Sequence, residues 1–216
     1  MRSIHELAYS YGVRSREEKW NLYSARFPPR RGERVLDVGV SSMDDVPGTN
    51  FFLRQYPYPD QVVAVGLDDQ SNLARRYPSV TFVEADGRSL PFRDDEFDVV
   101  HSNAVIEHVG GSAEQRQFAA ELVRVARSGF ITTPNRWFPI EPHSRVPLLH
   151  WLPRPVLVRG MRALGHDDWP VWLLSAARFR GLLPVGVETD FRCTRMAWLP
   201  ASLVIIFQKR GAEVPR

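Results

Sequence analysis

Cysteine is nearly absent from this chain of 216 residues: Cys193 stands alone, so no disulfide can form within the chain. A chain without disulfides suits a reducing compartment, and we expect an intracellular, cytoplasmic location. Long apolar runs are absent as well, because no stretch approaches the ~20 residues that a membrane-spanning helix needs. The stretch 1–11 has no long apolar core and carries Glu6, which argues against a secretory signal.

A strong charge of either sign is also missing. Lys and Arg number 28 against 25 Asp and Glu, which gives a net charge of +3. The sequence pI is about 9.3, but no run of five or more basic residues occurs, so nucleic-acid binding is not indicated. Hydrophobic residues make up 44% and charged residues 25% of the chain, as in ordinary globular proteins. The length suits one domain with a sizeable core.

The stretch Val35–Gly39 is the natural centre of the sequence. It is an apolar run that ends in a glycine, as expected of a parallel strand that is buried on both faces. Further strand patterns cover 61–67, 80–84, 97–102 and 129–133, and helical patterns cover 51–55, 73–76 and 113–126. Strands that alternate with helices at this spacing predict an α/β fold with a parallel, doubly wound sheet.

The two ends of the chain differ from this central part. The start reads as a helical leader that the Pro28-Pro29 pair ends, and 134–172 is a stretch rich in proline and tryptophan. We predict that this stretch is a lid inserted over the sheet, with a helix near 155–164. A helix near 173–182 and an antiparallel hairpin of strands, 185–191 and 202–207, then close the chain. We expect one domain with four parts: 1–32, 33–133, 134–172 and 173–216.

The turn after Gly39 is the first candidate binding element. Small residues at such a turn, here Ser41 and Ser42, let backbone N–H groups approach a ligand closely. In open α/β sheets ligands bind beyond the carboxyl ends of the strands. We therefore expect a nucleotide-like ligand over Gly39. The alternative is that the glycine serves turn geometry alone.

Acidic residues follow the next two strand patterns. Asp68 ends the second strand, where a carboxylate can accept hydrogen bonds from both hydroxyls of a ribose. Asp68 or Asp69 could instead cap the helix that follows. Asp86 ends the third strand, where it could hold an adenine amino group or simply form a turn before Gly87. Two residues after the fourth strand would line the floor of the same crevice: Asn103 and Ala104.

Taken in order, these segments resemble a class I S-adenosylmethionine-dependent methyltransferase. The resemblance covers roughly 30–135, and the segments that carry it are Val35–Gly39, Val65–Asp68, Glu84–Asp86, Leu90–Phe92, Phe97–Val100 and Glu107–Val109. It implies a Rossmann-like, doubly wound and mostly parallel sheet of seven strands whose last strand is antiparallel. It also implies S-adenosylmethionine as the cofactor.

The resemblance implies roles for single residues. The turn at Gly39 would approach the methionine part of the cofactor, Asp68 the ribose, and Asp86 with Ala85 the adenine, while Asn103 and Ala104 would lie near the sulfonium. The full predicted cofactor set is Asp37, Gly39, Val40, Ser41, Asp68, Asp69, Ala85, Asp86, Gly87, Asn103 and Ala104.

One departure from the family stands out: its turn usually carries two or three glycines, whereas here only Gly39 is present. How the amino-acid tail would be held is therefore open, and the Ser41 and Ser42 hydroxyls are candidates. A protein that binds the cofactor, or a partner, without methyl transfer is the competing hypothesis.

The segment after the fifth strand pattern is the candidate acceptor side. Glu141 and His143 lie two residues apart in it, so in an extended segment they point the same way. A histidine that a carboxylate orients is a plausible general base for a hydroxyl. Alternatively, His143 caps a loop, and Glu141 pairs with Arg136 or Arg145.

His108 is the rival base, because in related enzymes its position lies near the acceptor. It could equally be an ordinary residue in the first turn of a helix. Together with Glu107, Glu141 and His143 it could also collect a divalent cation such as Mg²⁺, although no spacing here is diagnostic of a metal.

The acceptor itself is expected to be a small molecule. Tryptophans and prolines of the lid offer flat apolar faces beside polar groups, which suits stacking against a sugar ring. The predicted substrate residues are Asn135, Arg136, Trp137 and Glu141. The run 134–143 is similar to one in small bacterial methyltransferases near glycan biosynthesis, which favours a carbohydrate hydroxyl. An aromatic or lipid acceptor would fit the same faces, and the apolar patches 146–149 and 169–174 leave a dimer or membrane-surface contact open.

Overall fold

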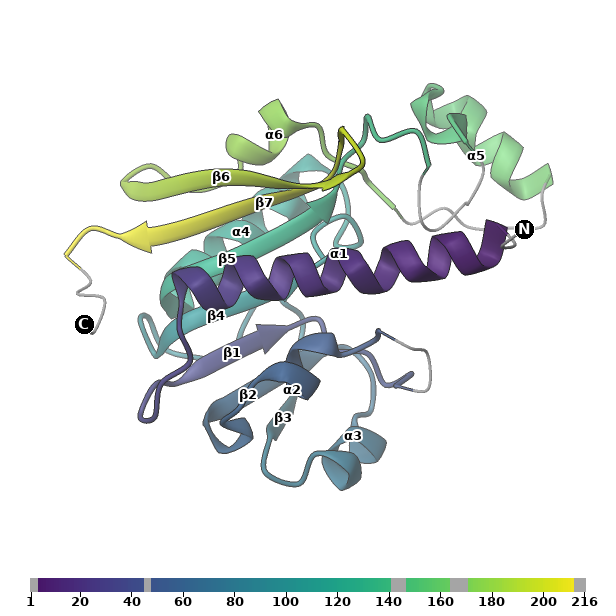
Figure 1. The fold of residues 1–216 in the computed structure, drawn as a ribbon. Helices are drawn as coiled ribbons and strands as arrows, with labels where there is room; N and C mark the ends of the chain where they lie inside the picture. The colour runs from purple at the N-terminus through teal and green to yellow at the C-terminus, as the bar shows by residue number, and fades with distance from the viewer. Residues whose placement is uncertain (1–3, 45–47, 141–146, 164–170, 212–216) are drawn as a thin grey trace.

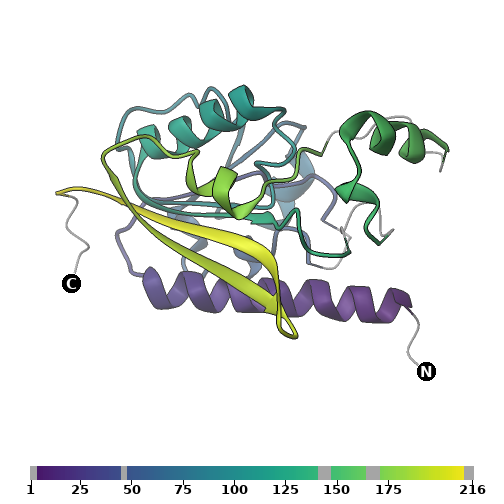
Figure 2. The ribbon, with the colours of Figure 1, turned by 90° about the horizontal axis from the view of Figure 1, so that it is seen from above.

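The computed structural model describes residues 4–44, 48–140, 147–163 and 171–211, with side chains from residue 12 onward. In this part of the chain, one sheet of seven strands lies between two layers of helices (Figures 1 and 2). The strand order is β3-β2-β1-β4-β5-β7-β6. The predicted Rossmann-like α/β sheet is confirmed.

The strands run β1 (Val35–Val38), β2 (Val62–Gly66), β3 (Thr81–Glu84), β4 (Phe97–Asn103), β5 (Ala126–Pro134), β6 (Val187–Met196) and β7 (Leu199–Lys209). β1 to β5 pair in parallel, whereas β7 is antiparallel to both of its neighbours, as predicted. The strand order reverses at β1, which lies between β2 and β4. Such a switch point leaves a crevice at the carboxyl ends of the two strands, where ligands bind in open α/β sheets.

An aromatic cluster fills one face of the sheet. α1 (Ile4–Arg26) covers this face, joined by the short helices α2 (Phe51–Gln55) and α3 (Ser71–Arg76), while η1 (Pro59–Gln61) leads into β2. Tyr23 of α1 is almost fully buried and meets Phe52 of α2 and Phe130 of β5 edge to face, with ring centroids 5.1 and 5.7 Å apart. These contacts anchor the leader helix on the sheet.

The opposite face is covered by α4 (Ser112–Val125) and α6 (Ala176–Arg180). α4 agrees closely with the predicted helix, and Phe118 and Leu122 on its apolar side are fully buried. Phe118 packs so closely on Gly87 that a Cβ there would lie 2.5 Å from its ring. Gly87 therefore allows α4 to reach the sheet.

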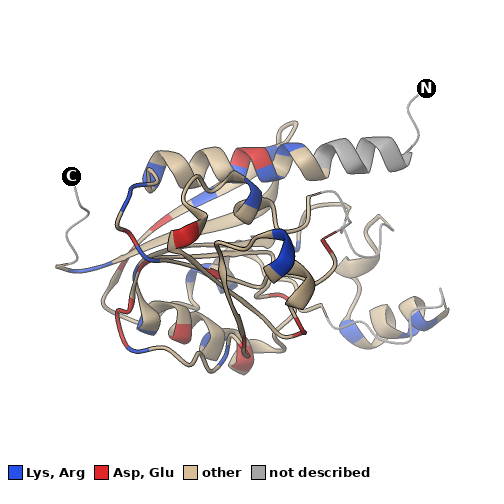
Figure 3. Ribbon diagram, turned by 90° about the horizontal axis from the view of Figure 1, so that it is seen from below, with Lys and Arg blue, Asp and Glu red and all other residues tan. Residues whose placement is uncertain are grey.

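The lid lies beyond the carboxyl ends of β1, β4 and β5 (Figure 1). Its described part contains η2 (Leu149–Trp151) and α5 (Arg154–Ala163), close to the predicted helix at 155–164. A small apolar cluster holds it together: Leu157, Met161, Val171 and Leu173. α5 carries basic residues without acidic ones, whereas α1 and α4 carry both, as Figure 3 shows.

The helix predicted at 173–182 is shorter in the structure, where α6 begins at Ala176. Leu174 instead lies in an extended segment, fully buried, and forms a parallel bridge with Asn135. Ser175 then accepts a hydrogen bond from Arg178 N and so defines the start of the helix. The predicted closing hairpin is confirmed, with longer strands. Within the described residues, no helix has both the length and the apolar character needed to cross a membrane.

Candidate functional site

At the switch point, where a crevice is expected, the turn after β1 begins at Gly39. Its φ of +103° is one that L side chains rarely adopt, and a Cβ on it would lie 2.1 Å from Cγ2 of Val105. Val105 follows β4, so the turn after β1 and the loop after β4 meet here. Glycine is required for this close approach, which answers the question that the sequence left open.

The backbone N–H groups of this turn are engaged by the chain itself. Gly39 N and Val40 N both donate to Val65 O, at 2.8 and 3.0 Å, and Ser41 N donates to Asn50 Oδ1 at 3.0 Å. The N–H groups of Gly39, Val40 and Ser41 are therefore not free to face a ligand. Val40 belongs to the buried core. The Ser41 hydroxyl accepts from Met43 N at 3.2 Å and keeps its own O–H to donate.

Asp37 lies away from the crevice, on the face that α1 and α2 cover. It is buried, and its Oδ1 lies 2.7 Å from Nδ1 of His101 on the neighbouring strand. The His101 ring stacks on Phe52, with centroids 4.2 Å apart. This buried pair joins β1 to β4, and it gives no support to a cofactor role for Asp37.

The adjacent acids after β2 have different surroundings. Asp69 accepts hydrogen bonds from the backbone N of Ser71, at 2.9 Å, and from its hydroxyl, and these bonds lower the pKa of Asp69. It thereby fixes the start of α3. Asp68 is exposed, and it makes no hydrogen bond or ion pair within the part of the chain that the structure describes. Its carboxylate is available at the end of β2.

Asp86 forms a forked ion pair with Arg88, with Nη2 2.6 Å from Oδ2 and Nε 3.0 Å from Oδ1. These hydrogen bonds lower the pKa of Asp86 and keep it ionised. A carboxylate has about four lone-pair positions, so it can accept a further donor beside Arg88. Ala85 donates its N–H to Gly66 O at 3.0 Å, which holds this turn against β2.

Gln70 is a candidate that the sequence analysis missed. Its side chain is buried against Gly66, where a Cβ would lie 2.4 Å from Nε2 and 2.6 Å from Val40 O. Neither polar atom of its amide has a partner among the described residues. A buried amide without partners costs about 1–3 kcal/mol. The arrangement suits a polar ligand that reaches the amide between the turns after β1 and β2.

Lys19 is the second missed residue. It comes from α1 and is buried, and its Nζ donates to Asn103 Oδ1 at 3.0 Å. The same oxygen accepts from Thr132 Oγ1 at 2.7 Å. Burial, together with the smaller effect of the Arg16 charge, lowers the pKa of Lys19 to about 8, against the still smaller opposing effects of Glu107 and Glu18. α1 thus brings a cation to Asn103, the predicted floor of the crevice.

The loop after β4 continues this floor. Ala104 has a φ of +58° and donates its N–H to Thr132 O at 3.0 Å. Glu107 is fully buried, and its Oε2 accepts from Thr133 Oγ1 at 3.0 Å. His108 is exposed in a turn that precedes α4, so the expectation of a first-turn helical residue is corrected.

Of the predicted substrate residues after β5 that the structure describes, one is buried and structural, and the others lie at the surface or beside a cavity. Asn135 is buried and braces the lid, because Nδ2 donates to Pro200 O at 2.8 Å and Oδ1 accepts from Trp137 N at 3.1 Å. The Trp137 side chain is 57% exposed and meets Trp151 edge to face. Arg136 lines a cavity beneath the lid.

His143, the predicted general base, and Glu141, the carboxylate predicted to orient it, lie outside the described residues. Arg145 lies outside them as well. Where the chain is described, no group of three His, Cys, Asp or Glu side chains is arranged to hold a metal ion.

Comparison with known proteins supports a methyltransferase core. Residues 46–131 match the family described as "Methyltransferase domain". A probable S-adenosylmethionine-dependent methyltransferase of Mycobacterium tuberculosis is 37% identical over 81 residues, which cover 35% of this chain. The match spans only 28% of the length of that relative.

Solved structures share the fold over nearly the whole chain. The [4+2]-cyclase SpnF has a TM-score of 0.60 at 14% identity, covering 90% of this chain and 80% of its own. Magnesium protoporphyrin IX methyltransferase of Synechocystis with bound SAH, S-adenosylhomocysteine, has a TM-score of 0.59 at 12% identity, covering 97% and 89%. The fold is that of class I S-adenosylmethionine-dependent methyltransferases, and 46–131 carries the matching domain sequence. Because a cyclase shares the fold, the fold alone does not define the reaction.

Proposed function

We propose that this protein is an S-adenosylmethionine-dependent O-methyltransferase that acts on a hydroxyl of a small carbohydrate. The observation that carries the proposal is the crevice at the β1 switch point. Gly39 lets the turn after β1 pack closely on Val105 of the loop after β4, and Asp68 and Asp86 follow the ends of β2 and β3 at the same edge of the sheet.

The residues of the crevice fit the cofactor. The Asp68 carboxylate has no partner among the described residues and can accept the two ribose hydroxyls, and Asp86 keeps acceptor positions for the adenine amino group. Polar groups of the ligand would give the buried Gln70 amide the partners that it lacks. When bound, S-adenosylmethionine supplies a methyl group on a positively charged sulfur. The Ser41 hydroxyl is a donor for the amino-acid tail.

The chain contributes to catalysis mainly by position. A sulfonium loses its charge as the methyl leaves, so a dry pocket does not oppose the transfer. Holding acceptor oxygen, methyl and sulfur in line is therefore the main requirement. We propose that His143, oriented by Glu141, is the general base that accepts the proton of the acceptor hydroxyl. His108 is the rival candidate for this role.

The lid supports a carbohydrate acceptor. The Trp137 and Trp151 side chains are 57% and 39% exposed, so they offer flat faces against which a sugar ring can stack. As the particular activity we propose that of the sugar 1-O-methyltransferase of methylmannose polysaccharide synthesis, because the chain resembles that enzyme. The 1-hydroxyl of a methylated mannoside is accordingly the first acceptor to test. An aromatic or lipid hydroxyl is the alternative that the same faces allow.

Titration calorimetry with S-adenosylmethionine tests the cofactor half of the proposal. We expect Asp68→Ala to weaken binding roughly 10- to 100-fold, because hydrogen bonds to a charged group contribute about 1.5–3 kcal/mol. Asp69→Ala is the matched control: the neighbouring acid serves α3, so cofactor affinity should change little. Equal losses in both variants would contradict the assignment.

Release of S-adenosylhomocysteine with a panel of acceptors tests the second half. The panel holds methylated and unmethylated mannosides, aromatic alcohols and lipid alcohols. Turnover with a mannoside would support the proposal. Turnover only with an aromatic or lipid alcohol would show that the acceptor belongs to that class instead. Full turnover by His143→Ala would exclude that base. Tight cofactor binding with no turnover on any acceptor would favour a binding protein.

A further inference from the structure

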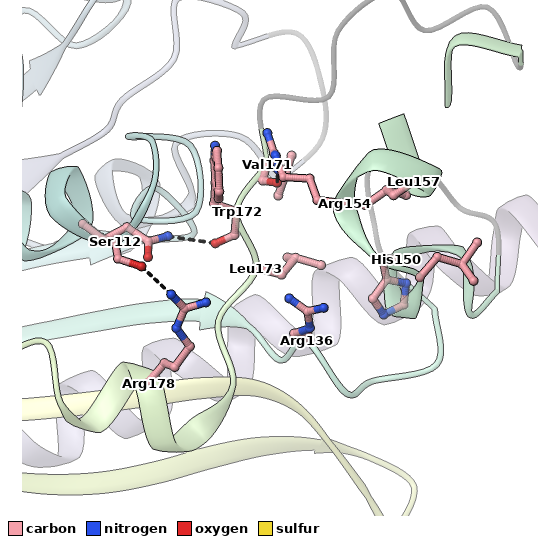
Figure 4. A pocket seen from close by; sticks show the side chains of 11 residues that line it. Ser112, Arg136, His150, Arg154, Leu157, Val171, Trp172, Leu173 and Arg178 are labelled. Atoms are coloured by element: carbon pink, nitrogen blue, oxygen red, sulfur yellow. Dashed lines mark hydrogen bonds between the residues drawn. The ribbon is translucent and has the colours of Figure 1, made fainter. Parts of the chain in front are cut away.

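A cavity of about 130 Å³ lies beneath the lid, between the start of α4, α5 and α6 (Figure 4). Three arginines line it from three separate segments. Arg136 follows β5, Arg154 begins α5, and Arg178 lies in α6. No acidic residue is found in the described lining. Arg136 and Arg178 thus bring two positive charges to one cavity, and like charges repel one another unless an anion lies near them.

The two arginines at the open side are not neutralised within the described part of the chain. Arg178 donates to the Ser112 hydroxyl, and no ion pair is found for it there. The Arg136 guanidinium lies 5.7 Å from the ring centroid of Trp137, and it too forms no ion pair within the described ranges. Each therefore keeps N–H donors for a ligand, because a guanidinium carries five.

The inner side of the cavity is apolar and fixed. Leu157, Val171 and Leu173 are buried in its wall. Arg154 donates to Val171 O at 3.1 Å and lies 3.5 Å over the centroid of the Trp172 ring, and burial lowers its pKa. A charged group is stabilised more by a fixed guanidinium in such surroundings than in open water.

Hydrogen bonds tie the wall of the cavity to the loop after β4. Trp172 N donates to Glu107 O at 2.7 Å, and Gln115 Nε2 donates to Trp172 O at 2.8 Å. Glu107 belongs to the loop after β4, which continues from Asn103 and Ala104. The segment that lines the cavity at Trp172 is thus fixed to the loop that begins at the predicted residues Asn103 and Ala104.

We infer that this cavity binds an oxyanion, a phosphate or a carboxylate, of the methyl acceptor. The planar fork of Arg matches both groups. This inference rests on the proposed function and changes its first acceptor: in place of a neutral methylated mannoside, it predicts a carbohydrate that carries an anionic group, such as a sugar phosphate or an acidic sugar.

Calorimetric titration of the full chain with inorganic phosphate, and separately with malonate, tests the inference at constant ionic strength. We expect saturable binding of at least one of them. Arg136→Gln and Arg178→Gln should each weaken it about tenfold, as loss of one charged hydrogen bond predicts. Binding of phosphate alone identifies a phosphate group, and binding of malonate alone a carboxylate. Binding of neither overturns the inference.

Arg180→Gln is the matched control, because Arg180 belongs to the same helix but lies over Phe191, 3.9 Å from its ring centroid. An equal loss in this variant would overturn the inference, since net charge alone would explain it. S-adenosylmethionine affinity should be unchanged in all three variants, which also shows that they are folded. Loss of cofactor binding in the Arg136 or Arg178 variants would assign the cavity to the cofactor instead. Failure of the unsubstituted chain to bind S-adenosylmethionine would contradict the proposed function alone.

Discussion

The two sides of the crevice are built differently. On the cofactor side, Gly39, Asp68 and Asp86 each lie within two residues of a strand end, and the sheet itself brings them together. On the proposed acceptor side, Arg136, Arg154 and Arg178 come from the segment after β5, α5 and α6. The residues proposed to bind the cofactor thus lie at strand ends, where local sequence patterns can predict them. The residues proposed to bind the acceptor come from segments far apart in the chain.

The same difference is seen in packing. The cofactor side rests on strands whose residues belong to the two large core clusters of the sheet. The described lid rests on a cluster of four buried residues. We therefore expect substitutions at buried cofactor-side residues to change both the free energy of unfolding and the cofactor affinity. Substitutions on the lid surface should change only KM for the acceptor.

Gly39→Ala should have the largest effect. A Cβ at a φ of +103° is strained, and it would also overlap Val105, whose branched side chain has little freedom to turn away. Together these effects should lower the free energy of unfolding by about 3 kcal/mol and abolish cofactor binding. Urea unfolding and calorimetry measure both.

Gly186→Ala is the control that separates backbone strain from steric overlap. Gly186 has a φ of +95°, but a Cβ there would have no heavy atom within 4 Å. It should lose only about 1 kcal/mol and keep cofactor affinity. Equal losses for the two glycines would show that close approach at Gly39 is unimportant.

Lys19→Met should change how stability depends on pH. The folded pKa of about 8 lies below the ordinary value of 10.5, so between these values the unfolded chain binds more protons than the folded one. The free energy of unfolding should therefore rise by about 2 kcal/mol from pH 7 to pH 9.5 in the natural chain. Lys19→Met should lack this rise. Lys209→Met, which removes the chain's other lysine, should retain it; a rise that survives in Lys19→Met would contradict the burial of a titrating amine.

Gln70→Leu should change stability and affinity in opposite directions. Replacing a buried amide that lacks partners leaves the free energy of unfolding equal or higher, while S-adenosylmethionine affinity falls roughly tenfold. Gln115→Leu is the control, since its buried amide is paired with Ile106 O and Trp172 O. That variant should lose about 1–3 kcal/mol of stability. A stability loss for Gln70→Leu of the same size would show that its amide has partners in the folded chain.

Trp137→Ala should have the smallest effect on the fold. The side chain is 57% exposed, so the free energy of unfolding should change by less than about 0.5 kcal/mol. Cofactor affinity should not change, whereas KM for the acceptor should rise. A change in cofactor affinity would place Trp137 on the other side of the crevice.

The core elements could be predicted from sequence because their signals are local. β1, β4 and α4 fall within two residues of the predicted bounds, and α2 matches them fully. α6 was predicted too long because Leu173 and Leu174 continue its apolar pattern; in the structure they are buried beside Asn135 and the lid instead. Apolar residues alone did not distinguish a helix from a buried extended segment.

The missed site residues had no local signal. Lys19 lies 84 positions from Asn103, so their contact exists only after α1 has packed on the sheet. Gln70 follows the acids after β2, and only the position of Gly66 shows that its amide is buried. The turn after Gly39 was misjudged because its N–H groups find partners in Val65 and Asn50, which the spacing of the sequence does not reveal.

A crystal structure with S-adenosylhomocysteine tests the central claim most directly. The account predicts the adenosine between Asp68 and Asp86, with the amino-acid tail over Gly39 and a polar group of the ligand in contact with the Gln70 amide. Density for the ligand elsewhere, with Asp68 left in solvent and Gln70 still without a partner, would contradict it.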